Sequence, residues 1–241
     1  MEPINFKNLE ITGYVIVHNF LDRAIIEKIT EDYVIQKELF LKNNNAKNHK
    51  IVPSGFNLKD RLLPIVSEIR KQTNLKISDP ISRAYFDNQI SQFTWHQDHE
   101  PYFKSRDSYN AINFWIPIIK PFLNESGISI IPQDVLEQHC PDIYANKIVG
   151  KGAKGFKPQD SQTLMRDDDN LSEISILPVN LDNISISPSL AEGDLLILRQ
   201  DVIHKTQDSV SSRVAYSSRC NNVLPGSAGA DKFAQWLNSL K

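Results

Sequence analysis

Apolar positions in the first third of the chain mainly follow the spacing of helices. A short alternating run at Tyr14–Val17 predicts a strand. After it, apolar residues recur at helical spacing over 23–41, with Asp22 placed to cap the first turn, and a second run of this kind begins near Asp60. We therefore expect helices within about 20–76 that brace a sheet.

From about residue 81 the pattern changes to short apolar runs separated by turn residues. Such runs, spread over about 81–221, are typical of a β-sandwich or barrel. One of them, Leu195–Leu198, is continuously apolar after a Gly-Asp turn signal and predicts a buried strand. The last residues, 231–241, return to helical spacing with one apolar stripe, which would cover the barrel or meet a second subunit. The pattern predicts a mainly β domain with flanking helices, as a monomer or a homodimer.

A long stretch over about 140–183 interrupts the strand pattern. Connections of this length in a compact domain are usually lids, substrate-binding insertions or disordered segments, and we expect a lid, with a passive linker as the alternative. Within it, Gly150–Gly155 matches the letters of the dinucleotide-binding fingerprint. No convincing strand precedes this motif, and Pro158 lies where a helix should begin, so we interpret it as a loop. The lysines of the stretch would suit an anionic or carrier-linked molecule, although a solvated run of charge is the commoner reason for such a pattern.

Composition indicates an ordinary globular protein. The 241 residues are 40% hydrophobic and 23% charged, enough for one substantial core, and we expect a single domain over 1–241. A formal net charge of −2 argues against nucleic acid or an anionic membrane as a partner. No run reaches about 18 apolar residues and the start has no export pattern, so we expect a soluble, unexported protein. Cys140 and Cys220 are too few for a disulfide framework and fit free thiols in a reducing cytoplasm.

His96 and Asp98 are the strongest candidates for chemistry. They lie one residue apart in the apolar, strand-like run Gln92–Asp98, and side chains two positions apart on a strand project from the same face. His204, just past the predicted strand at Leu195–Leu198, would supply a third ligand. Two histidines and one carboxylate on one face of an octahedron describe a mononuclear non-haem iron site with open positions.

The His-x-Asp triplet alone is weak, because a solvated pair on an exposed strand gives the same letters. The placement of His204 at a strand end favours the interpretation of these residues as metal ligands. His99 and His139 are expected to be surface histidines. Arg213 opens the next strand-like run. We expect that strand to return antiparallel to the His204 strand and to bring the guanidinium beside the metal.

Together these residues resemble the phytanoyl-CoA dioxygenase-like branch of the Fe(II)/2-oxoglutarate-dependent oxygenases. The resemblance covers most of the chain, because the family's motifs occur here in the family's order. These motifs are Gly13–Val17, Asn19–Asp22, Trp95–His99, Ala111–Ile118, Ser126–Pro132, and Gly193-Asp194 ahead of His204–Thr206. The resemblance implies a double-stranded β-helix, the jelly-roll form of the predicted β domain.

The resemblance also implies roles for individual residues. It places iron at His96, Asp98 and His204. It places the distal carboxylate of 2-oxoglutarate on Arg213 and a hydrogen bond to this cosubstrate on Thr206. Asn113 shares a predicted strand face with Trp115 and would border the cosubstrate.

Two positions depart from the family pattern. Pro132–Val135 replaces the family's proline-glycine-serine-histidine turn, and the spacing from His204 to Arg213 is short. Arg219 lies an even number of positions beyond Arg213, so on a regular strand both would share a face. Either arginine could therefore hold the cosubstrate.

The implied activity is a dioxygenase reaction that uses Fe(II), 2-oxoglutarate and O2. It would release succinate and CO2 and hydroxylate an unactivated C–H bond of a small molecule or carrier-linked metabolite. Desaturation or cyclisation at the same site is one alternative. A non-catalytic, metal-dependent jelly roll that binds a small ligand is the alternative from another class.

Overall fold

The structure is a computed structural model that describes residues 4–42, 51–90, 92–99, 107–168, 172–208 and 212–220. The helix expected over 231–241 and most of the loop before residue 51 lie outside these ranges. The elements are, in chain order, α1 (Asn8–Ile11), β1 (Tyr14–Val17), α2 (Arg23–Lys42), β2 (Val52–Pro53), α3 (Lys59–Gln72), β3 (Ser82–Asp87), β4 (Ile112–Ile119), β5 (Ile128–Ile130), α5 (Gln133–His139), α6 (Pro141–Ile143), the π-helix η2 (Tyr144–Ile148), β6 (Lys154–Gln159), β7 (Gln162–Asp167), β8 (Ile174–Leu177), α7 (Leu181–Ile184), β9 (Leu195–Arg199), β10 (His204–Thr206) and β11 (Val214–Cys220).

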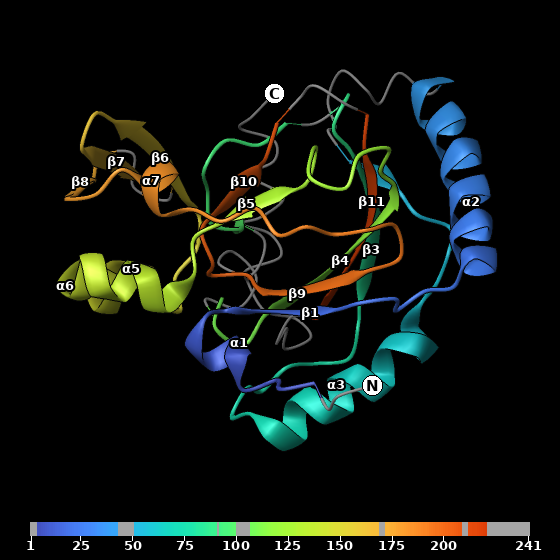
Figure 1. Cartoon of the computed structure of the whole chain (residues 1–241), viewed down its shortest axis with the longest axis horizontal. Helices are drawn as coiled ribbons and strands as arrows, with labels where there is room; N and C mark the ends of the chain where they lie inside the picture. Colours follow the sequence, from blue (N-terminus) through green and yellow to red (C-terminus); the bar gives the residue numbers. More distant parts are fainter. Residues whose placement is uncertain are drawn as a thin grey trace.

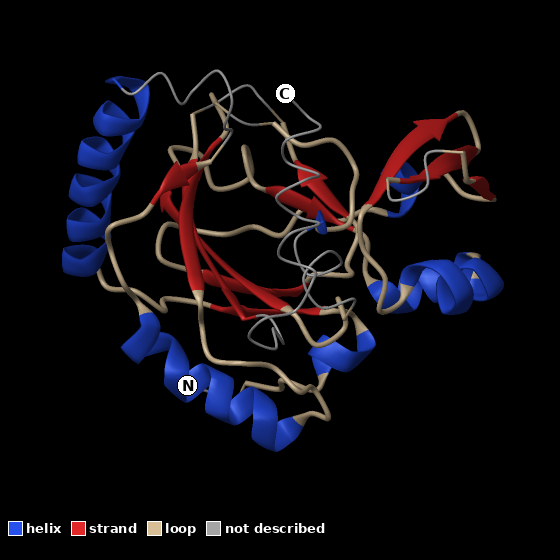
Figure 2. Ribbon diagram, turned by 180° about the vertical axis from the view of Figure 1, so that it is seen from behind, coloured by secondary structure: helices blue, strands red, loops and turns tan. Residues whose placement is uncertain are grey.

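Antiparallel strands form two facing layers, as predicted for a jelly roll. The larger sheet has the order β1-β9-β4-β11-β3-β2, and β10 pairs with β5 in the smaller one. Helices α2 and α3 lie outside the larger sheet (Figure 1). Figure 2 shows the same arrangement from behind, with a three-stranded sheet, β6-β7-β8, projecting from the opposite side.

Alternate residues of β4 pack into different cores, as expected for a strand covered on both faces. Ile112, Phe114 and Ile116 belong to a cluster that includes residues of α2 and α3. Trp115 belongs to a second cluster with Ile128 and Ile130 of β5, so its face of the strand looks into the space between the two sheets. The candidate site lies at one end of this interior.

The local helix and strand predictions for the N-terminal part are confirmed. β1 covers the predicted range, and α2 begins and ends within one residue of the predicted helix. The Ile25 amide donates to Asp22 Oδ1 at 3.0 Å, which is the expected N-cap. In the part of the chain that the structure describes, no helix has the length and apolar character needed to cross a membrane.

The stretch over 140–183 is folded, which corrects the expectation of a loop. It contains α6, η2, β6, β7, β8 and α7. Phe156, Met165 and Leu177 pack in a third core cluster that also contains Trp95, beside His96 in sequence. Polar residues between these apolar positions obscure the strand pattern in the sequence. Cys140 and Cys220 are free, buried thiols, and burial raises the pKa of both.

Candidate metal centre

The segment that carries His96 and Asp98 is not a regular strand, contrary to the sequence prediction. It forms single bridges, with His96 opposite both His204 and Gly155. His96 and His204 exchange two backbone hydrogen bonds of 3.0 Å, and the Phe156 and Ala153 amides donate to the carbonyls of Trp95 and Asp98. The segment is therefore held between β10 on one side and β6 on the other. Because bridged residues share a face, His96 and His204 project together.

Each of the two imidazoles is oriented by a hydrogen bond to the backbone carbonyl two residues before it. His96 Nδ1 lies 2.8 Å from the Thr94 carbonyl, and His204 Nδ1 lies 3.0 Å from the Val202 carbonyl. A carbonyl oxygen only accepts, so each Nδ1 carries the proton and each Nε2 presents a lone pair. This tautomer is the one that binds a metal through Nε2.

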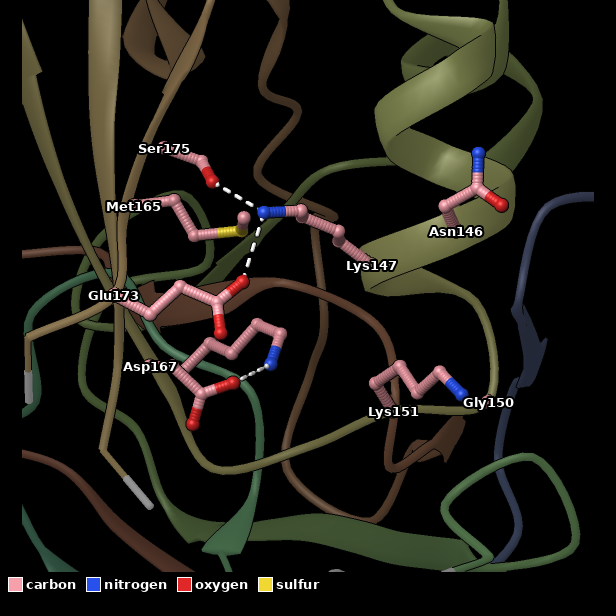
Figure 3. Close-up of a pocket in the computed structure, with 9 residues that line it drawn as sticks. Asn146, Lys147, Gly150, Lys151, Met165, Asp167, Glu173 and Ser175 are labelled. Carbon is pink, nitrogen blue, oxygen red and sulfur yellow. Dashed lines mark hydrogen bonds and ion pairs between the residues drawn. The ribbon is translucent and has the colours of Figure 1, made fainter. Parts of the chain in front are cut away.

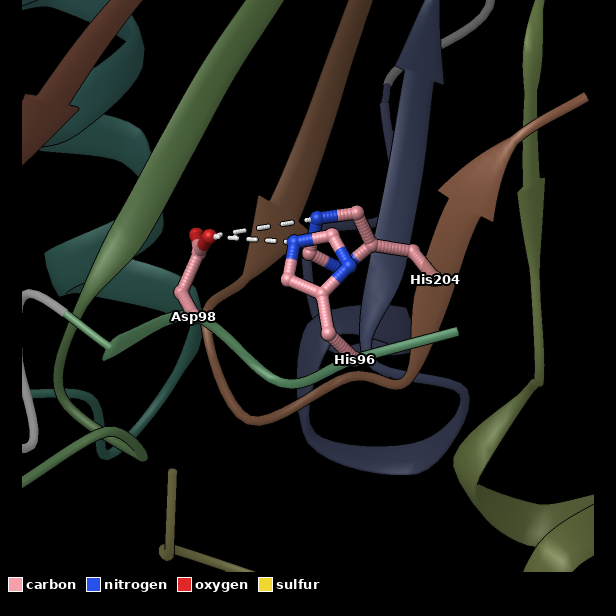
Figure 4. Close-up of side chains that lie close together, drawn as sticks. All are labelled: His96, Asp98 and His204. Carbon is pink, nitrogen blue, oxygen red and sulfur yellow. Dashed lines mark ion pairs between the residues drawn. The ribbon is translucent and has the colours of Figure 1, made fainter. Parts of the chain in front are cut away.

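The two Nε2 atoms converge on the carboxylate of Asp98. His96 Nε2 and His204 Nε2 lie 3.8 and 3.9 Å from Asp98 Oδ1 (Figure 4). One ligand atom from each of the three side chains lies within 4.8 Å of the other two. Asp98 Oδ2 is buried and has no hydrogen-bond partner among the described residues. The structure thus brings together the three residues that the sequence singled out.

Electrostatics favours the protonation states that a cation requires. Burial, and then the neighbouring His204, lower the pKa of His96 to about 3. Burial raises the pKa of Asp98, but the Arg219 guanidinium and the two imidazoles outweigh it and hold that pKa below its usual value. His96 is therefore neutral and Asp98 ionised near pH 7, which are the forms in which these side chains ligate metals.

The expected pairing of the strand after His204 is wrong. β11 pairs with β3 and β4 in the larger sheet, while β10 pairs with β5 in the smaller one. The chain crosses between layers after β10, so the end of β11 nearest the triad is its C-terminal end. Arg219 Nη2 lies 3.6 Å from Asp98 Oδ1. The guanidinium beside the triad is therefore that of Arg219.

Arg213 lies at the other end of β11, buried in the interior. Its guanidinium stacks over the Trp115 ring at 5.2 Å, and its backbone amide donates to Asn88 Oδ1. Its Nε has no hydrogen-bond partner, and no described residue forms an ion pair with it. Burial lowers the pKa of Arg213 to about 10, only partly offset by Asp87 and Asp208. The guanidinium stays charged at neutral pH, and none of the described residues contacts it as a counter-ion.

The two remaining predicted site residues, Asn113 and Thr206, lie on β4 of the larger sheet and β10 of the smaller sheet. Asn113 is buried on β4, and its Oδ1 accepts from the Ser217 hydroxyl at 2.7 Å. As predicted, it faces the interior with Trp115. Thr206 Oγ1 accepts from the Phe93 amide at 3.0 Å, which ties β10 to the segment before His96. Its hydroxyl proton remains able to donate to a further acceptor.

Of the two histidines predicted to lie at the surface, His99 and His139, only His139 is exposed, at the end of α5. His99 Nε2 lies 2.6 Å from Asp168 Oδ2, with 17% of its side chain exposed. The surface prediction for His99 was wrong because the folded insertion brings the end of β7 over it.

Sequence reasoning did not single out Gln97, which is fully buried and lies between His96 and Asp98 in the sequence. An amide flanked by a candidate His and Asp in an apolar run was the available signal. The sequence analysis also did not place Arg219 beside Asp98. The even spacing between Arg213 and Arg219 puts both on one strand face and does not tell which of them lies near the candidate metal ligands.

The lysine-rich part of the insertion lines a cavity of about 300 Å³ on the far side of β6 (Figure 3). Because side chains alternate along β6, Lys154 lies on the face opposite Gly155 and His96. Its ammonium group forms an ion pair with Asp167 at 2.5 Å. Lys147 pairs with Glu173 and Ser175, each at 2.8 Å. Lys147 and Lys154 are thus neutralised by acidic partners, and Lys154 faces away from the triad, so these two lysines give no support to an anionic substrate at the triad. The fingerprint at Gly150–Gly155 leads into β6 and not into a helix. The loop interpretation is confirmed for Gly150–Ala153 and is wrong for Lys154 and Gly155, which belong to β6.

Comparisons with known proteins show which solved structures share this fold. No family model matches the sequence, and no curated protein matches it. Solved structures do match. EvdO2 from Micromonospora carbonacea var. aurantiaca, complexed with 2-oxoglutarate, has a TM-score of 0.53 and 10% identity over 91% of this chain and 93% of its own.

Two further structures are similar over comparable lengths. SnoK, a non-haem alpha-ketoglutarate-dependent carbocyclase from nogalamycin biosynthesis, has a TM-score of 0.55 and 12% identity over 95% of this chain and 89% of its own. HygX from Streptomyces hygroscopicus, with nickel and 2-oxoglutarate bound, has a TM-score of 0.50 and 10% identity over 90% and 85%. The chain therefore has the jelly-roll fold found in non-haem 2-oxoglutarate-dependent enzymes.

Proposed function

We propose that this protein is an Fe(II)- and 2-oxoglutarate-dependent dioxygenase that hydroxylates a small or carrier-linked molecule. Iron would be held by His96, Asp98 and His204, and the distal carboxylate of 2-oxoglutarate by Arg213. The observation that carries the proposal is the convergence of two oriented Nε2 atoms on a buried carboxylate with an unpartnered oxygen. Within this fold, that donor set suits a mononuclear non-haem iron centre.

The residues present fit the metal. When bound with 2-oxoglutarate and O2, iron supplies the oxidising power for an unactivated C–H bond, with succinate and CO2 as co-products. The protein's own part is geometric. Thr94 and Val202 carbonyls fix the imidazoles, and Arg219 keeps Asp98 ionised. A metal held by these three side chains would keep coordination positions free for cosubstrate and O2.

The residues present also fit a dicarboxylate cosubstrate. A buried guanidinium without a contacting anion costs several kcal/mol of desolvation, so the fold keeps Arg213 at a penalty that a bound carboxylate would offset. Residues 213, 215, 217 and 219 alternate onto one face of β11, which links Arg213 to the triad end of the interior. A non-catalytic jelly roll that bound a small anionic ligand could use the same charge, so succinate formation is the measurement that separates the two alternatives.

Hydroxylation is the outcome we favour within this reaction class. In related halogenases a small residue replaces the carboxylate ligand and chloride takes its place, whereas this chain keeps Asp98. We expect no chlorinated product from the unmutated enzyme in chloride buffer, measured by mass spectrometry of any substrate that supports succinate release. A chlorinated product would contradict the assignment of Asp98 as a ligand. Ring formation stays the second candidate, since SnoK, of the same fold, is a carbocyclase.

The insertion over 140–183 is proposed to close part of the site. β6 is tied to the ligand segment by backbone hydrogen bonds, whereas β8 is the edge of its sheet with Ile174 and Ile176 exposed. We expect the amides of β6 to exchange slowly without ligands. The amides of β8 should exchange fast and become protected when Fe(II), 2-oxoglutarate and a turnover-supporting substrate bind without oxygen. Unchanged exchange in β8 would make the insertion a passive element.

The direct test of the function is succinate formation. The purified protein with Fe(II), 2-oxoglutarate and O2 should release succinate above its uncoupled background when the right compound is present in a screen of amino acids, sugars, nucleotides and acyl carriers. Omission of Fe(II) should abolish the signal. A protein that binds Fe(II) and 2-oxoglutarate tightly but never forms succinate would favour the ligand-binding alternative.

A further inference from the structure

Gln97 separates the two proposed ligands of its segment and faces away from them. Its side chain is fully buried, and its Nε2 donates to two backbone carbonyls, those of Ile148 at 3.0 Å and Asp201 at 2.6 Å. Its Oε1 has no partner among the described residues. The opposite orientation of the amide would set an oxygen against two carbonyl oxygens, so the contacts determine which atom points where.

The two acceptors belong to parts of the chain that are remote in sequence. Asp201 lies in the turn between β9 and β10, three residues before His204, and Ile148 ends the π-helix η2. One side-chain amide therefore connects the segment of His96 and Asp98 to the turn that leads into His204. It also connects that segment to the insertion.

Asp201 is itself held rigidly. Arg199 donates to its carboxylate through Nε at 2.9 Å and Nη2 at 2.7 Å, and both side chains are fully buried. The Gly150 amide donates to Asp201 Oδ2 at 2.7 Å. Arg199 is fixed in turn by the Leu9 carbonyl and by stacking over Tyr109 at 4.1 Å. The carbonyl that receives the Gln97 amide therefore belongs to a turn with little freedom to move.

We infer that Gln97 is a positioning residue, which sets the separation between Asp98 and His204 before metal binds. The inference rests on the proposed metal site. Beyond the two backbone bonds between His96 and His204, it is the amide of Gln97 that fixes the far side of the ligand segment against the His204 turn. Residues that orient ligands without touching the metal typically change metal affinity by about 10- to 100-fold when replaced.

Gln133 provides a matched control. It is buried, its Nε2 donates to the same Asp201 carbonyl at 3.1 Å, and its Oε1 also lacks a described partner. It lies on α5, however, and not in a segment that carries a proposed ligand. A loss caused only by removing one of the two amide donors to the Asp201 carbonyl should therefore appear in both glutamine variants.

The experiment compares Gln97→Met with Gln133→Met, which keep side-chain volume and remove the amide. Apo-protein is titrated with Co(II), followed by visible absorption, and the thermal midpoint is measured without metal. We expect Gln97→Met to bind Co(II) at least about tenfold more weakly, with a changed absorption band. Gln133→Met should keep the affinity and band of the unmutated protein, while both variants lower the thermal midpoint.

Each other outcome has a defined meaning. Unchanged Co(II) affinity and spectrum in Gln97→Met, or equal losses in both variants, would overturn the positioning role. If Gln97→Met does not fold, Gln97→Asn replaces it, because this variant keeps a buried amide but sets it back by one methylene. A Co(II) affinity of Gln97→Asn equal to that of the unmutated protein would also overturn the role. Failure of the unmutated protein to bind Co(II) would instead contradict the proposed metal site.

Discussion

Replacing any one of the three proposed ligands with alanine should lower turnover by at least about a hundredfold, more than the loss typical of residues that only orient ligands. His96→Ala, Asp98→Ala and His204→Ala each remove one of three atoms that converge within 4.8 Å. Two remaining ligands cannot define one face of an octahedron. The measurements are Fe(II) affinity of the apo-protein and succinate release.

His139→Ala is the control for this series. His139 is an exposed histidine at the end of α5, so its replacement should leave Fe(II) affinity and turnover unchanged. Circular dichroism should report the same fold for all four variants. Full iron binding and turnover by His204→Ala would remove His204 from the site, and a loss in His139→Ala would make that histidine the next candidate.

The second large effect concerns the cosubstrate. Arg213→Lys should raise the 2-oxoglutarate concentration for half-maximal activity at least tenfold, or ~1.4 kcal/mol, because an ammonium poorly replaces a planar fork that donates two parallel hydrogen bonds. The affinity can also be measured without turnover, from the visible absorption of the anaerobic Fe(II) and 2-oxoglutarate complex.

Arg219→Lys separates the two arginines. Arg219 lies beside Asp98, and lysine would keep a positive charge there, so Arg219→Lys should leave the 2-oxoglutarate requirement of the metal-loaded enzyme nearly unchanged. The opposite ranking of the two variants in a 2-oxoglutarate titration would assign the carboxylate to Arg219. The buried charge of Arg213, only partly offset by Asp87 and Asp208, would then need another explanation.

The sequence was informative where structure depends on nearby residues. β1 and α2 follow from the spacing of apolar positions and one capping aspartate, which act within a few residues of each other. The alternation in β4 likewise predicted that Asn113 and Trp115 share a face. In the insertion, by contrast, β6 contains a glycine, a proline and two lysines, which are poor strand signals, so the same reasoning gave a loop.

The arrangement of the site was harder to predict because it depends on pairing between distant strands. The chemistry of His96, Asp98 and His204 was recognisable from residue type and spacing. Which arginine lies beside them depended on β11 crossing to the larger sheet, and no local pattern specifies that choice. The contacts of Gln97 depend on two carbonyls that only the folded chain brings near it.

The two-sided pairing of the ligand segment bears on how the protein is made. During synthesis the chain emerges at about 5–20 residues per second, so His96 and Asp98 precede His204 by on the order of ten seconds. During that interval β10 has not yet been synthesised, and at first β6 is also missing. The segment with His96 and Asp98 therefore has no strand on either side to hold it. A metal ion could therefore be held by all three side chains only after translation has passed Thr206.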